Sequence, residues 1–215
     1  MKPLLSIPYV PDVTHFAIDD MVSFIVSALI AVMVNAEGQG FMATLLGDTH
    51  PDRSRRLHFN AFLHLDLLGT LCFLVAGFGW PRKVMIDPSR FSSPRIHMLI
   101  CRVAGPVANL LMASIAGSIV WILTRYGAED RVFTMVVIVN LTMAVYGLLP
   151  IAPLAGSGVL DILCGPWQGF LRYYHLAGPY LLIGLFLLER LTQVALPGRF
   201  LDPLVVAAVD YLTGT

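Results

Sequence analysis

The chain has 215 residues, of which 57% are hydrophobic and only 13% are charged. Soluble domains carry about 25% charged residues. Half that share, together with a mean hydropathy of +0.75, excludes an ordinary soluble protein and indicates an integral membrane protein in contact with lipid. The formal net charge is zero, so no attraction to nucleic acid is expected.

Apolar segments long enough to cross a bilayer predict an all-α polytopic membrane protein. A spanning helix needs roughly 20 mostly apolar residues. We expect the whole chain, residues 1–215, to form a single membrane domain with five to six transmembrane helices. The expected spans cover about residues 18–46, 62–80, 96–124, 132–149 and 179–196, with a shorter terminal helix over 202–215.

Two segments interrupt this helical pattern. The stretch PRKVMIDPSRFSSPR, residues 81–95, predicts a short extended hairpin at the membrane surface, because of its prolines and its alternation around Val84 and Ile86. The stretch PIAPLAGSGVLDILCGP, residues 150–166, has too many prolines and glycines for a regular spanning helix. Such backbone must be buried in protein or face a water-filled cavity, because lipid cannot satisfy its amide groups.

Ionisable side chains inside the apolar segments are candidates for cavity or helix-contact roles, because burying a charge in lipid is costly. Glu37 lies near the end of its helix and could reach the interface. His64 and Asp66 are two residues apart, so on a helix they point in different directions and do not easily share a metal. Arg102 is expected to snorkel or to pair with an acid, and Asp161 is a further candidate.

Two uncharged polar residues, Asn109 and Asn140, also lie within apolar segments. We expect their side chains to hydrogen-bond irregular backbone rather than to carry chemistry.

Four stretches, taken together and in this order, resemble the site-2 protease family of intramembrane zinc metalloproteases, particularly its compact bacterial members. The resemblance covers about residues 24–164 and leaves the C-terminal helices, about 178–215, outside it. The stretches are LLGD (45–48), HLDLLGT with FGWPRKVMIDPSRF (64–70 and 78–91), AGPVANLLMA (104–113) and GLLPIAPLAGSGVL (147–160).

The departures from the family pattern fall on its chemistry. By the resemblance, the two histidine ligands of zinc fall on Asn35 and Gln39, and the glutamate that activates water falls on Ala36. The third zinc ligand falls on Ala155, and the asparagine before Leu-Leu-Pro falls on Gly147. A shift by one residue would place Glu37 on the glutamate but would put Ala36 and Gly40 at the ligand positions.

Neutral amides and methyl groups are poor zinc ligands. We therefore expect no cofactor, no metal and no catalytic residue, and a pseudoprotease rather than an enzyme. The expected role is that of a binding or structural subunit, whose partners are other integral membrane proteins in a larger assembly. A cavity between the first, third and fourth spans would either hold a transmembrane segment or serve as a packing surface in a larger assembly. The resemblance to bacterial members places the protein in the bacterial inner membrane.

Two alternatives stay open from the sequence. One is a metalloprotease with a rearranged site, whose ligands would come from Glu37, His58, His64, Asp66 and Asp161. The other is a small transporter or binding module, in which the broken segment at residues 150–166 forms the site.

Overall fold

The computed structural model describes residues 8–10, 17–49, 59–128, 130–192 and 197–214, and the regular elements within them are all helical. The expected all-α class is confirmed. The α-helices are α1 (Ile18–Leu45), α2 (Leu67–Ala76), α3 (Pro94–Arg125), α4 (Arg131–Tyr146), α5 (Ser157–Leu163), α6 (Gln168–Thr192) and α7 (Gly198–Thr213). Two short 3-10 turns, η2 (Ala61–His64) and η3 (Pro88–Arg90), complete the set.

Three of these helices are long and apolar enough to cross a membrane, namely Ile18–Leu45, Pro94–Arg125 and the Gln168–Glu189 part of α6. The 16 residues of α4 extend about 24 Å and the 10 residues of α2 about 15 Å, at 1.5 Å per residue. Both lengths are below the roughly 30 Å of a hydrocarbon core. The expected count of five to six spans is therefore not confirmed.

The second expected span, residues 62–80, is instead a short helix with turns on both sides. The Asp66 side chain caps the start of α2 by accepting the Gly69 N–H. Gly77 ends the helix with φ of 71°, a left-handed conformation that favours glycine. The chain then runs back past α2, and a Cβ atom on Gly69 would collide with the Trp80 carbonyl oxygen. Local turn chemistry therefore overrides the apolar composition of this segment.

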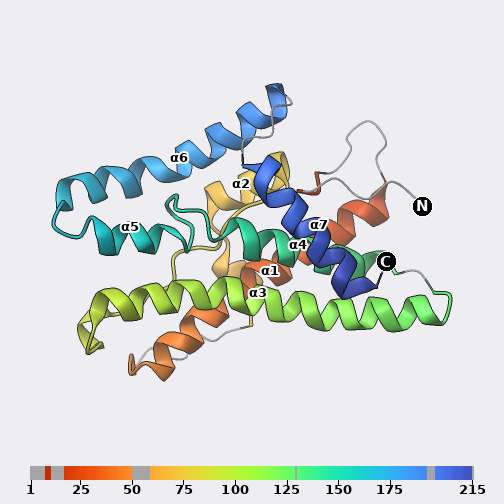
Figure 1. Ribbon diagram of the computed structural model, residues 1–215, viewed down its shortest axis with the longest axis horizontal. Coiled ribbons are helices and arrows are strands. Elements are labelled where there is room, and N and C mark those ends of the chain that lie inside the picture. The colour runs from red at the N-terminus through yellow and green to blue at the C-terminus, as the bar shows by residue number, and fades with distance from the viewer. Residues whose placement is uncertain (1–7, 11–16, 50–58, 129, 193–196, 215) are drawn as a thin grey trace.

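The centre of the molecule is formed by α1, α3 and α4, which pack against one another, with α7 lying on α3 and α4. In Figure 1, α3 and α6 lie at opposite edges of the view and α4 lies between them. Close approach of α1 and α3 depends on Gly105, where a Cβ atom would collide with Asn35 Oδ1. Small residues allow this kind of contact between membrane helices.

The described part of the α6 helix begins at Gln168, well before the expected start at Pro179, which lies inside it. Its outward side is apolar and exposed, with Leu176, Tyr180, Leu181, Leu187, Leu188 and Leu191 among the exposed side chains. Its inward residue Phe186 contacts Phe78 and Tyr146, at ring-centroid distances of 5.4 and 5.8 Å. This helix thus joins the core at one end and forms a wall of the cavity described next.

Candidate functional site

A cavity of about 200 Å³ lies at the meeting point of α1, α3, the end of α4, the segment 153–157 and α6. Residues 78–84 and Ile86, after α2, form a further wall. Sequence reasoning placed residues 78–80 at the end of a span and residues 81–95 at the membrane surface, rather than in a site. The cavity is thus built from more elements than the expected first, third and fourth spans.

Four of the five positions that the resemblance assigned to the protease centre line this one cavity. They are Asn35 and Gln39 on α1, Gly147 at the end of α4, and Ala155 before α5. The fifth, Ala36, is fully buried next to Asn35 and is not among the lining residues. The structure therefore brings together residues that are as far apart in sequence as Asn35 and Ala155.

Side-chain amides form a continuous hydrogen-bonded ladder from this cavity into the core. Gln39 Nε2 donates to Asn35 Oδ1 over 2.8 Å, and Asn35 Nδ2 donates to Asn109 Oδ1 over 2.6 Å. Asn109 Nδ2 donates to Asn140 Oδ1 over 2.9 Å, and Asn140 Nδ2 donates to the Val136 carbonyl over 2.9 Å. Asn35, Asn109 and Asn140 are all buried.

Two backbone carbonyls fix the direction of this ladder. The Val136 carbonyl can only accept, so Asn140 must turn its NH2 group toward it and its oxygen toward Asn109. Asn109 is fixed independently, because its NH2 group also donates to the Ala31 carbonyl over 2.9 Å. Each amide then determines the next, which leaves the Gln39 oxygen as the ladder's acceptor at the cavity end.

The partners of Asn109 and Asn140 differ from expectation. Their carbonyl acceptors, on Ala31 and Val136, belong to regular helices rather than to irregular backbone. A buried amide has two donors and one oxygen to satisfy, and neighbouring amides can satisfy them where irregular backbone is absent.

The residues at the cavity do not fit a zinc ion. Asn35 uses both its oxygen and its NH2 group within the ladder, and Ala155 offers no donor atom. Zinc in proteins is bound by imidazole, thiolate or carboxylate. Among the described residues, no three His, Cys, Asp or Glu side chains come together to hold a metal. The expectation that the chain carries no metal or catalytic residue stays a prediction.

Glu37 and His64 form a buried pair away from the cavity lining. Glu37 Oε1 lies 3.0 Å from His64 Nε2 and accepts the Phe59 N–H over 3.1 Å. Both residues are buried, so Glu37 does not extend to an exposed interface as its sequence position had suggested. The pair connects α1 to the η2 turn and explains why two ionisable groups tolerate this apolar region.

Asp66 is separate from this pair, as its spacing from His64 predicts. Its Oδ1 accepts the Gly69 N–H over 2.9 Å and the Trp80 Nε1–H over 3.1 Å. Asp66 therefore caps α2 and attaches the returning chain to it. The rearranged set of metal ligands is therefore not brought together. Glu37 and His64 form one cluster, Asp66 belongs to a second and Asp161 to a third. His58 lies outside the described residues.

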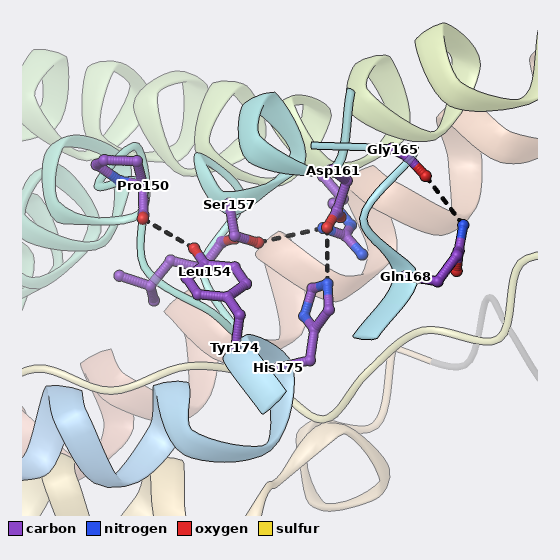
Figure 2. Close-up of polar contacts among 9 residues, drawn as sticks. Pro150, Leu154, Ser157, Asp161, Gly165, Gln168, Tyr174 and His175 are labelled. Carbon is purple, nitrogen blue, oxygen red and sulfur yellow. Dashed lines mark hydrogen bonds and ion pairs between the residues drawn. The ribbon is translucent and has the colours of Figure 1, made fainter. Parts of the chain in front are cut away.

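Arg102 pairs with an acid, and that acid is Asp161. Arg102 Nη1 donates to Asp161 Oδ2 over 2.6 Å and to Ser157 Oγ over 3.1 Å. The other Asp161 oxygen lies 2.7 Å from His175 Nε2. Figure 2 shows His175 reaching from α6 toward Asp161 on α5, with Tyr174 donating to the Pro150 carbonyl beside it. This cluster joins α3, α5 and α6.

Sequence reasoning missed His175 and Ser157. His175 could have been found as a histidine within an otherwise apolar helix. Ser157, one helical turn before Asp161, did not stand out in a segment rich in small residues.

The extended segment after Pro81 is anchored by the aspartate of the LLGD stretch. Asp48 is fully buried and accepts the Asp87 N–H over 2.9 Å, with Arg90 Nε 4.0 Å from its Oδ1. Hydrogen bonds from the Ser89 side chain and backbone hold the pKa of Asp87 below its ordinary value. The expected strand pairing reduces to an isolated bridge between Leu65 and Pro81 in the described chain. Residues 82–87 belong to no helix or strand, and Arg82, Lys83, Val84 and Ile86 among them line the cavity.

Comparison with known proteins identifies a similar protein. The chain is 29% identical over 161 residues to a protein of Bacillus subtilis (strain 168) named putative zinc metalloprotease YwhC. The match covers 71% of this chain and 74% of the relative. No family model matches the chain, and no solved structure matches it. The similarity supports a protease-like family.

This finding contradicts one expectation from the sequence. The interpretation of the chain as a pseudoprotease rather than an enzyme is overturned by a relative named as a metalloprotease, and no observation shows this protein to be inactive. Asn35, Gln39 and Ala155 line the cavity, and Ala36 is buried next to Asn35. Their identities do not show that the protein lacks activity.

Proposed function

We propose that this protein is a site-2-protease-like membrane protein whose cavity binds an apolar segment of another membrane polypeptide. The similarity to a named metalloprotease supports a polypeptide ligand, since proteases act on polypeptides. Binding is the step that a proteolytic, regulatory or assembly role would share. As part of the same proposal, we place the protein in a bacterial cytoplasmic membrane. There, the binding could take the form of a stable complex between the protein and its partner.

The observation that carries this proposal is the combination of surfaces in the cavity. Leu68, Phe78 and Met143 provide apolar walls, while Gln39 offers an amide whose oxygen is directed by the ladder. In lipid, a peptide group without a hydrogen-bond partner costs several kcal/mol. A polypeptide entering this cavity would meet both apolar side chains and polar partners for its backbone.

The backbone of residues 83–86, which belongs to no helix or strand, adds to this argument. Among the described residues, no backbone hydrogen bond is formed by these four residues, whereas Arg82 N–H donates to the His64 carbonyl over 2.7 Å. Extended backbone with unpaired amide groups can pair with another extended chain. The segment therefore supports a bound polypeptide better than a compact small molecule.

Photo-crosslinking from inside the cavity tests the proposal. A photoreactive amino acid at Leu68 or Met98, both cavity residues, should capture a membrane polypeptide in cells. The same group at Ile115, which is 60% exposed on α3 outside the cavity, is the matched control. Filling the cavity with Ala155→Trp should abolish capture, whereas Val107→Trp on the exposed face of α3 should not. Equal capture from all positions, insensitive to Ala155→Trp, would refute the proposal.

A second candidate function is metal-dependent proteolysis, and the name of the relative is the observation that favours it. The residues described at the cavity do not fit zinc, so the ligands would have to come partly from elsewhere in the chain. Metal analysis of the purified protein, beside a double variant His64→Ala and Asp66→Ala, addresses this candidate. A stoichiometric metal that is lost in the variant, with cleavage of a membrane substrate, would establish it.

A further inference from the structure

The charged side chains that line the cavity are mostly basic. Arg82, Lys83, Arg102 and His175 line it together with one acid, Asp66. A cavity with walls of low polarity concentrates the field of such charges and favours a ligand of opposite sign. The question is therefore which of these charges are already neutralised within the protein.

Two of the basic groups are internally paired. Arg102 and His175 share the carboxylate of Asp161, at 2.6 and 2.7 Å. Asp66, the acidic lining residue, is occupied by the Gly69 N–H and by the Trp80 indole N–H, both neutral donors. Asp66 therefore holds the wall together and forms no ion pair with a described basic residue.

Arg82 and Lys83 differ from these groups. Both side chains are exposed, on the extended segment that borders the cavity. Within the part of the chain that the structure describes, neither forms an ion pair, because the pairs present involve other residues. Two adjacent cations thus border the cavity without an acidic partner among the described residues.

We propose that the polypeptide segment bound in this cavity carries a carboxylate, either an acidic side chain or a free C-terminus, which Arg82 and Lys83 receive. The inference rests on the proposed function and specifies the chemistry of the ligand. Charge complementarity carries it: the apolar side chains of the cavity suit an apolar chain. The two cations at its border, which form no ion pair with a described residue, suit a negative group on that chain. The Asp161 carboxylate between Arg102 and His175 shows that basic groups of this cavity already hold a carboxylate.

Synthetic peptides reconstituted with the full-length protein in phosphatidylcholine nanodiscs test the inference. The probes are a lysine-flanked, leucine-rich peptide with one glutamate near its end, its glutamine counterpart, and a pair with free or amidated C-terminus. Affinity is measured by energy transfer between labelled peptide and labelled protein. The glutamate peptide should bind about 3- to 10-fold more tightly than the glutamine peptide, as expected for contacts with two partly exposed cations. The second pair distinguishes a side-chain carboxylate from a terminal one.

The double variant Arg82→Gln and Lys83→Gln should remove this preference without unfolding the protein, because both side chains are exposed. The control is Arg125→Gln, whose guanidinium stacks 4.4 Å from the Trp121 ring. It lies about 35 Å along α3 from Arg102, and its loss should leave the preference unchanged.

Three outcomes would overturn the inference. Equal binding of all peptides, unchanged in the double variant, would leave the proposed function intact and reject the carboxylate. Binding of no peptide would reject the proposed function and the inference together. Loss of the preference in phosphatidylglycerol nanodiscs, with loss of bound anionic lipid in the double variant by native mass spectrometry, would assign the two cations to lipid phosphate instead.

Discussion

Removing Asn109 is the sharpest test of the amide ladder. This buried side chain makes three hydrogen bonds, to Asn35 Nδ2, to the Ala31 carbonyl and to Asn140 Oδ1, over 2.6–2.9 Å. Hydrogen bonds contribute about 0.5–1.5 kcal/mol each in proteins and about 0.6 kcal/mol on average between membrane helices. Asn109→Ala should therefore lower the free energy of unfolding by roughly 2–4 kcal/mol, because it also leaves buried partners unsatisfied.

The direction of the ladder gives a second, more specific expectation. At pH 8, Asn109→Asp replaces an NH2 group by an oxygen that faces two acceptors, the Ala31 carbonyl and Asn140 Oδ1. It should destabilise the protein at least as much as Asn109→Leu, although aspartate has the shape of asparagine.

Unfolding in mixed micelles of increasing sodium dodecyl sulfate content, followed by tryptophan fluorescence, measures both effects. Ser114→Ala on the same helix is the control. This partly buried side chain bonds only its own helix, at the Leu110 carbonyl, and its loss should change the free energy of unfolding by less than about 0.5 kcal/mol. An Asn109→Asp protein as stable as the wild type at pH 8 would refute the directional ladder. An Asn109→Ala protein within the range of the control would refute the ladder altogether.

Four further predictions follow from the structure. Gly105→Leu should separate α1 from α3, since even a Cβ atom there collides with Asn35, and lower thermal stability in detergent more than Gly184→Leu, whose Cβ meets open space. Asp66→Ala should cost about 1 kcal/mol as a lost helix cap, visible as faster amide exchange in α2. The pKa of Asp87 is lowered, so its bonds to Ser89 should stabilise the segment at neutral pH and be lost as the pH falls through that pKa; protection of the Ser89 amide that persists in acid would contradict this. Introducing a zinc-type donor set should yield about one zinc per chain by elemental analysis, and a folded, metal-free variant would show that the backbone does not hold these positions in ligand geometry. The four substitutions are Asn35→His, Ala36→Glu, Gln39→His and Ala155→Asp.

Local sequence signals predicted where the helices lie better than they predicted how many helices cross the membrane. The apolar body of α1 and its end at LLGD follow from the sequence, and Gly47 after it has φ of 106°. Residues 62–80 have the composition of a span, yet Asp66 and Gly77 confine the helix to ten residues. The average hydropathy of residues 62–80 predicts one long helix, because the average hides the single residues, Asp66 and Gly77, that begin and end a shorter one.

The candidate site was predictable only in part. The resemblance placed Asn35, Gln39, Gly147 and Ala155 at corresponding positions, and the structure gathers them in one cavity. The wall formed by residues 78–84 and the presence of His175 were not predicted. Their contribution depends on how the chain returns along α2 and on where α6 lies, and neither is encoded in a local motif.

By itself, the sequence determined the membrane class, the helical composition and the identity of the polar side chains that lipid would penalise. Only the tertiary structure decided which of these groups meet, as Asn35 and Asn109 do across 74 residues of chain and Arg102 and Asp161 across 59. The physical reason is one of range. Burial and helix formation depend on composition and on neighbours within a few residues, whereas a buried amide or charge is satisfied by whichever group the packing of distant helices brings within about 3 Å.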